Sequence, residues 1–185
     1  MVATPSTMVS LGTPAPEFSL PDTISGQTMS LDELKSDVAT VVMFICNHCP
    51  YVKHIQEGLI QIAQDYQPEG VSFIAISSND VEQYPEDGPE AMKEVAQRLG
   101  YPFPYLFDET QEVAKAYSAV CTPDIFIFDE EMKLVYRGQF DDARPSNNIS
   151  VTGKDVRKAI DALLNDQPVD TQQKPSVGCS IKWKQ

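Results

Sequence analysis

Two cysteines separated by two residues stand where an apolar run gives way to a helical pattern. Residues 41–45, Val-Val-Met-Phe-Ile, are continuously apolar and include β-branched and aromatic side chains, which is typical of a strand buried on both faces of a parallel sheet. From Val52 to Tyr66 the apolar residues recur at spacings of three and four, as on one face of a helix. Cys46 and Cys49 are therefore predicted to lie on a strand-to-helix turn.

This location favours thiol chemistry. The first turn of a helix presents unpaired N–H groups and the positive end of the helix dipole, and both stabilise a thiolate. Cysteines in Cys-X-X-Cys motifs have pKa values lowered from about 8.5 to roughly 3.5–7.5, and the thiolate is the nucleophile of disulfide exchange. We expect Cys46 to attack a disulfide and Cys49 to resolve the mixed disulfide that results. His48 is either a solvent-exposed linker or, when protonated, a group that stabilises the Cys46 thiolate.

The charge of the chain limits its partners. Fourteen basic and 27 acidic side chains leave a formal charge of −13, which repels nucleic-acid phosphates and anionic lipid. The sequence contains neither a signal-peptide pattern nor an apolar run of membrane-spanning length. We therefore expect a cytoplasmic protein with no nucleic-acid or membrane partner. In a reducing compartment a Cys-X-X-Cys motif is more often catalytic or metal-binding than structural.

Strand and helix patterns alternate along most of the chain. Strand patterns cover residues 41–45, 71–77, 103–107, 125–128, 134–136 and 177–183, and helical patterns cover residues 31–35, 52–66, 90–99, 110–118 and 153–164. The alternation predicts an α/β fold whose central strands are parallel. A tight turn at residues 129–132 makes the two strands that it joins antiparallel.

The two ends of the chain have patterns of their own. Residues 1–12 are expected to be a flexible lead-in, residues 13–165 a single domain, and residues 166–185 a tail that packs on it. A short hairpin is expected between Phe18 and Ser30, and Ser30 with Glu33 forms a capping-box pattern. Thr152 is expected to cap the last helix. In the tail Val177, Cys179, Ile181 and Trp183 alternate with small or polar residues, which predicts a strand with these four side chains on one face.

Several segments together resemble known families. The Cys-X-X-Cys turn, with Thr122-Pro123 just before a buried strand, is similar to thioredoxin-fold proteins. Residues 12–22, Gly-Thr-Pro-Ala-Pro-Glu-Phe-Ser-Leu-Pro-Asp, resemble the entry segment of the alkyl hydroperoxide reductase and thiol-specific antioxidant family. The resemblance continues through residues 79–80, 84–87, 138–144 and 178–179 to uncharacterised peroxiredoxin-like proteins that carry a Cys-X-X-Cys motif. It implies a thioredoxin-like fold, with a central mixed β-sheet flanked by helices, an N-terminal hairpin and a C-terminal tail strand.

The same resemblance assigns supporting roles near the sulfurs. It implies a cis bond at Thr122-Pro123, where the Thr122 backbone would pair with an extended partner peptide. Cys49-Pro50 matches the peroxide-reacting cysteine of peroxiredoxins, but Cys46 occupies the position of their threonine, so the hydroxyl that orients peroxide is missing. His48 resembles the histidine before the second cysteine of strongly oxidising thioredoxin-fold enzymes.

The remaining cysteines leave two further questions open. Cys121 and Cys179 are candidate third thiols, but a role in filling the core is favoured for both, because free cysteine is among the most buried residue types. A zinc site would need two ligands besides Cys46 and Cys49, from His48, His54, Cys121 and Cys179. The sequence has no second Cys-X-X-Cys motif to supply them.

These features lead to one main hypothesis and two alternatives. The main hypothesis is a thiol-disulfide oxidoreductase that cycles Cys46 and Cys49 between dithiol and disulfide with protein or small-thiol partners, supported by His48, Thr122 and Pro123. The first alternative is a thiol-dependent peroxidase, an antioxidant enzyme that reduces hydroperoxides. The second is a metal-binding or redox-sensing module. No organic cofactor is expected, since cysteine carries the electrons.

Overall fold

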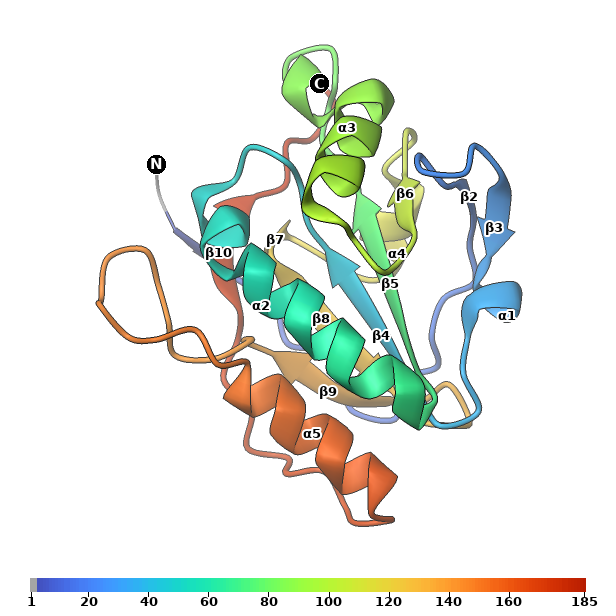
Figure 1. Cartoon of the computed structure of the whole chain (residues 1–185), viewed down its shortest axis with the longest axis vertical. Coiled ribbons are helices and arrows are strands. Elements are labelled where there is room, and N and C mark those ends of the chain that lie inside the picture. Colours follow the sequence, from blue (N-terminus) through green and yellow to red (C-terminus); the bar gives the residue numbers. More distant parts are fainter. Residues whose placement is uncertain (1–2) are drawn as a thin grey trace.

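A five-stranded mixed sheet forms the centre of the computed structural model, which describes residues 3–185 (Figure 1). Its strands lie in the order β6 (Tyr105–Phe107), β5 (Val71–Ser77), β4 (Ala39–Phe44), β8 (Asp124–Phe128) and β9 (Leu134–Gly138). β5 runs parallel to β4 and β6, whereas β8 runs antiparallel to β4 and β9. The expected α/β fold, with parallel central strands and an antiparallel pair after them, is confirmed.

Both faces of this sheet are covered. One face packs against α2 (Pro50–Tyr66), α3 (Pro89–Leu99) and α5 (Lys154–Leu164). The other packs against the hairpin of β2 (Ser19–Pro21) and β3 (Thr28–Ser30), α1 (Leu31–Leu34) and α4 (Glu112–Ala116). In β4, Val41 and Met43 face the first group, while Val42 and Phe44 face the second. This double burial explains the unbroken apolar run in the sequence. No helix within residues 3–185 is long and apolar enough to cross a bilayer.

Local residue chemistry sets the ends of the helices. Ser30 and Glu33 form both hydrogen bonds of the predicted capping box at α1. Cys49 is the N-cap residue of α2 and Pro50 its first residue, where the missing proline N–H has no helical partner to lose. A short 3₁₀ turn, η1 (Gln67–Glu69), follows α2, and a second, η2 (Pro85–Asp87), precedes α3. α3 ends at Gly100, whose φ of 71° is accessible to glycine without strain.

The start of α5 differs from the expected cap. Its N-cap residue is Gly153, not Thr152, and helix α5 begins at Lys154. The Asp141 carboxylate accepts the backbone N–H groups of Thr152 and Gly153, each at 2.7 Å. The Thr152 hydroxyl still accepts the Lys154 N–H at 3.3 Å, so it caps the first turn from one position before the N-cap residue, while Asp141 satisfies the two donors that precede the helix.

The two ends of the chain meet in a second small sheet. β10 (Val177–Ser180) lies between β1 (Thr4–Pro5) and β7 (Cys121–Thr122) and is antiparallel to both. The lead-in expected to be flexible is therefore partly a strand, because β10 offers it an edge to pair with; residues 1–2 of that segment lie outside the described residues. The C-terminal tail strand is confirmed.

The side chains of the tail do not share one face, in contrast to the prediction from their alternation. Cys179 joins the core beneath α2, whereas Ile181 joins the core on the opposite side of the central sheet. Trp183 retains 37% of its surface exposed. The strand ends at Ser180, so the alternation beyond it no longer indicates which way a side chain points.

Candidate active site

The fold places Cys46 and Cys49 on the turn between β4 and α2, as the sequence predicts. Cys46 follows the last residues of β4 and is 1% exposed, and Cys49 caps α2 and is 0% exposed. The peptide bond between Thr122 and Pro123 is cis, and it lies against the two sulfurs. The Cys49 Sγ is 3.2 Å from the Thr122 carbonyl oxygen, and the Cys46 Sγ is 3.6 Å from the Thr122 hydroxyl oxygen.

The electrostatics of the site favour Cys49 as the thiolate. A hydrogen bond from the Cys46 thiol, with further ones from Cys179 and Thr122, lowers the pKa of Cys49 to about 5 against the effect of burial. The same hydrogen bond to Cys49, then burial and the nearby charge of Asp87, raise the pKa of Cys46 well above its usual value. The sequence predicts the attacking thiolate at Cys46. The structure favours Cys49 instead, because α2 begins directly after Cys49 and Asp87 lies on the side of Cys46.

His48 is held by a buried carboxylate. Its Nδ1 lies 2.5 Å from Oδ2 of Asp87, and its backbone N–H donates to Oδ1 of the same group at 3.2 Å. The backbone N–H of Asn47 and the side-chain amide of Asn79 also donate to Asp87, each at 2.8 Å. The His48 ring stacks on Tyr84 at a centroid distance of 5.2 Å. Asp87 is 0% exposed while the His48 side chain is 16% exposed, so His48 is the part of this pair that meets solvent.

Sequence reasoning assigned no role to Asp87, Asn79 or Tyr84. All three lie in the segment between β5 and α3, which has no apolar periodicity and follows the carboxyl end of a parallel strand. Loops at this end of an open α/β sheet commonly line binding sites. That location, with the family resemblance of residues 79–80 and 84–87, was the signal available in the sequence.

Cys179 lies directly beside the Cys-X-X-Cys motif. Its Sγ is 2.9 Å from the Cys49 Sγ, although the two residues are 130 positions apart in the chain. Cys179 stands opposite Thr122 in the pairing of β10 with β7. The backbone edge that the resemblance assigns to a partner peptide is thus occupied by the chain's own tail.

Cys121 takes no part in this cluster. It is buried, and its Sγ points to the Pro123 carbonyl oxygen at 3.7 Å. Burial first, and then the charge of Asp124, raise the pKa of its thiol far above the usual value. The structure thus supports the interpretation of Cys121 as a core residue.

A metal ion would find a different ligand set from the one considered in the sequence. Among the described residues, one group could supply three ligands: Cys46, His48 and Asp87, whose ligand atoms lie within 4.8 Å of one another. Neither Cys121 nor Cys179 belongs to it, and His54 is half-buried on α2. Both Asp87 oxygens also accept hydrogen bonds from Asn47, His48 and Asn79.

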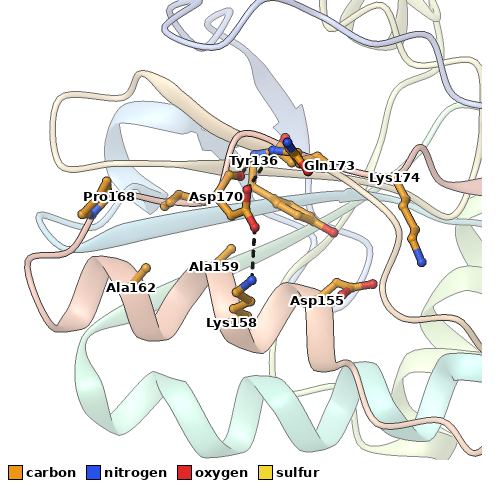
Figure 2. Close-up of a pocket in the computed structure, with 11 residues that line it drawn as sticks. Tyr136, Asp155, Lys158, Ala159, Ala162, Pro168, Asp170, Gln173 and Lys174 are labelled. Carbon is orange, nitrogen blue, oxygen red and sulfur yellow. Dashed lines mark hydrogen bonds and ion pairs between the residues drawn. The ribbon is translucent and has the colours of Figure 1, made fainter.

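A pocket lies elsewhere in the molecule, away from the cysteines. It has a volume of about 200 Å³ and lies between α5 and residues 168–174, with Tyr136 at its base (Figure 2). An ion pair of 3.2 Å between Lys158 and Asp170 crosses it. No cysteine lines this pocket.

The thiol pair at the β4–α2 turn and the cis-proline beside it define a protein of the thioredoxin-fold redox class. The chain belongs to the AhpC/TSA family, which it matches over residues 11–137.

Several solved structures share the fold of this chain. The chain is similar to an uncharacterised conserved protein from Geobacillus kaustophilus, with 64% identity over 100% of this chain and 97% of the other and a TM-score of 0.98. It is similar to a hypothetical protein from Sinorhizobium meliloti 1021, with 49% identity over 98% of each chain and a TM-score of 0.95. A secreted disulfide oxidoreductase from Mycobacterium tuberculosis shares the fold, with 16% identity over 78% of this chain and 95% of the other and a TM-score of 0.60. A comparison with curated proteins found no match.

Proposed function

We propose that the protein is a thiol-disulfide oxidoreductase that cycles Cys46 and Cys49 between dithiol and disulfide. The observation that carries this proposal is the pair of thiols at the start of α2, one of which is held as a thiolate beside the cis-Thr122–Pro123 bond. The substrates are disulfides or thiols of proteins or small molecules. A reducing compartment such as the cytoplasm fits the four buried cysteines, because thiols persist there.

The first step belongs to Cys49. Its thiolate attacks one sulfur of a substrate disulfide, the substrate S–S bond breaks, and one substrate sulfur leaves as a thiolate. The product is a mixed disulfide at Cys49. A nucleophile with a pKa of about 5 is fully ionised at neutral pH, so the step needs no general base.

The second step belongs to Cys46. Once Cys49 is part of a mixed disulfide, it can no longer accept a hydrogen bond as a thiolate or repel charge at Cys46. The pKa of Cys46 then falls, since these effects are among those that raise it in the reduced protein. The Cys46 thiolate attacks the Cys49 sulfur, expels the second substrate thiolate and closes the Cys46–Cys49 disulfide. His48 and Asp87, which each place a ligand atom within 4.8 Å of the Cys46 sulfur, receive its proton.

Two single substitutions test which cysteine attacks. Cys49→Ser should abolish release of the first thiol from a chromogenic aromatic disulfide, whereas Cys46→Ser should keep that first release. The burst of released chromophore in a single turnover measures this step directly. A burst that persists in Cys49→Ser and disappears in Cys46→Ser would assign the attack to Cys46.

A peroxidase is the second candidate, and one observation favours it. Cys49 precedes Pro50 and carries the lowered pKa, which also suits attack on a hydroperoxide. Two features count against this candidate. Cys46 replaces the hydroxyl that would orient the peroxide. Arg144, in the segment 138–144 that resembles the family, donates its guanidinium N–H groups to carbonyls of its own loop. If peroxide is the substrate, a sulfenic acid at Cys49 must be trapped by dimedone at low peroxide in the Cys46→Ser/Cys179→Ser protein, which lacks both neighbouring thiols.

A further inference from the structure

Cys49 has two thiol neighbours, not one. The Cys46 thiol donates a hydrogen bond to it, and the Cys179 Sγ, on strand β10, lies 2.9 Å from the Cys49 Sγ. A covalent S–S bond measures about 2.04 Å, so less than an ångström of movement separates Cys49 and Cys179 from bonding distance. Either neighbour is therefore placed to react with an oxidised Cys49.

The backbone holds Cys179 in this position firmly. β10 pairs with β1 on one side and β7 on the other, and Figure 1 shows it beside the first turns of α2. Gly178 lies so close to β7 that a Cβ atom there would be 1.9 Å from the Thr122 carbonyl oxygen. After the strand, the Lys182 backbone N–H donates to the Asn79 side chain at 2.9 Å, and the Lys182 carbonyl accepts the Asp80 N–H at 2.8 Å. The tail is thus fastened on both sides of the cysteine.

We propose that Cys179 is a third redox thiol, carried on a tethered strand that occupies the position of a peptide substrate at the Thr122 edge. The proposal rests on the function proposed above for Cys46 and Cys49. In the oxidised protein the Cys179 thiolate attacks the Cys49 sulfur, the Cys49–Cys179 bond forms and the Cys46–Cys49 bond breaks. Cys46 leaves as a thiolate and takes up the proton that Cys179 lost. No external oxidant is consumed, because one disulfide replaces another.

The charges around Cys179 determine in which redox state its thiol can react. In the reduced protein burial, with the hydrogen bond and charge of Cys49, raises the pKa of Cys179 to about 12. Both contributions of Cys49 vanish when Cys49 enters a disulfide, while the lowering effect of Lys182 remains. Cys179 is therefore least nucleophilic when all thiols are reduced, and its nucleophilicity increases once Cys49 is oxidised.

A variant without Cys46 isolates this reaction. Reduced Cys46→Ser protein is mixed with glutathione disulfide, quenched by acid at intervals, and analysed by intact mass and non-reducing peptide mapping. The expected result is a glutathione adduct at Cys49 that is lost as a Cys49–Cys179 disulfide forms within the chain. The Cys46→Ser/Cys179→Ser protein should keep the adduct, and Cys46→Ser/Cys121→Ser should lose it as Cys46→Ser does.

The outcomes separate the two proposals. A stable adduct in Cys46→Ser, together with a Cys46–Cys49 disulfide in the wild-type protein, would overturn the role of Cys179 and leave the oxidoreductase intact. A wild-type protein that gains neither an adduct nor a disulfide would overturn the proposed function itself. If Cys46→Ser does not fold, the wild-type protein oxidised in glutathione buffer provides the measurement. Chains with a Cys49–Cys179 bond and an alkylated Cys46 are then expected, and their absence overturns the proposal.

Discussion

A single hydrogen bond between two thiols decides where the charge of this site resides. A hydrogen bond from the Cys46 thiol makes the largest contribution to the lowered pKa of Cys49, and hydrogen bonds from Cys179 and Thr122 add to it. Asp87, buried beside Cys46, acts in the opposite direction on that residue. The motif is therefore asymmetric, with Cys49 as nucleophile and Cys46 as the thiol that keeps its proton until the second step.

This asymmetry predicts the effect of removing the donor. Cys46→Ala should raise the pKa of Cys49 above about 5, because the largest contribution to its lowering is the Cys46 hydrogen bond. Ultraviolet absorbance of the thiolate, followed against pH in Cys46→Ala and in the wild-type protein, measures the shift. Cys121→Ala serves as the control and should leave the midpoint of the thiolate titration unchanged. An unchanged midpoint in Cys46→Ala would show that other groups stabilise the anion.

The sequence predicts part of this site and misses another part for physical reasons. Cys46 and Cys49 are predictable because strand and helix periodicities meet at them, and Thr122-Pro123 because the dipeptide precedes a buried strand. The location of the thiolate cannot be predicted in this way, since it depends in part on groups distant in the chain: Asp87, which raises the pKa of Cys46, and Thr122 and Cys179, which lower that of Cys49. The contact of Cys49 with Cys179, across 130 residues, depends on the pairing of β10 with β7, which no local pattern indicates.

At the scale of elements, β10 separates the sulfurs from solvent. One edge of β10 pairs with β7, and the other edge of β10 pairs with β1. The alternation in the tail predicts that a strand forms, but an apolar alternation identifies a face and not the neighbouring strand. The same limit explains why the lead-in was expected to be flexible, since Thr4 and Pro5 have no strand pattern and gain their structure from β10.

A substitution in β10 tests this shielding. Gly178→Ala should displace the strand from β7, because the added Cβ would meet the Thr122 carbonyl oxygen at 1.9 Å. We expect Cys49 to react faster with a bulky thiol reagent in this variant, measured by mass spectrometry after timed labelling of the reduced protein. Ser180→Ala, at an exposed position of the same strand, is the matched control and should label at the wild-type rate. Equal rates in all three proteins would show that β10 does not limit access.

At the scale of the whole molecule, the thiolate links folding to pH. The pKa of Cys49 is about 5 in the folded protein and near 9 in the unfolded chain. Between these values the unfolded chain holds a proton that the folded protein lacks, so the free energy of unfolding rises with pH. This stabilisation is fully present above the unfolded pKa and is lost as the pH falls through about 5. Cys46, whose folded pKa is raised, is protonated in both states below pH 9 and adds no slope there.

This linkage gives a measurable difference between two proteins. Reduced wild-type protein should gain stability from pH 5 to pH 8 more steeply than reduced Cys49→Ser, by at most about 1.4 kcal/mol per pH unit. Urea unfolding at a series of pH values, with a reductant present, measures both slopes. Parallel slopes would mean that Cys49 holds its proton in the folded protein.

The exchange reaction at Cys49 is the centre of this account, and one stopped-flow experiment tests it most directly. Fully reduced protein is mixed with glutathione disulfide and, in parallel, with hydrogen peroxide at the same concentration, and the first products are mapped by mass spectrometry. We predict that the disulfide reacts faster and that its first closed product is the Cys46–Cys49 disulfide. A far faster reaction with peroxide, proceeding through a sulfenic acid at Cys49 while glutathione disulfide fails to exchange, would contradict the account and identify a peroxidase.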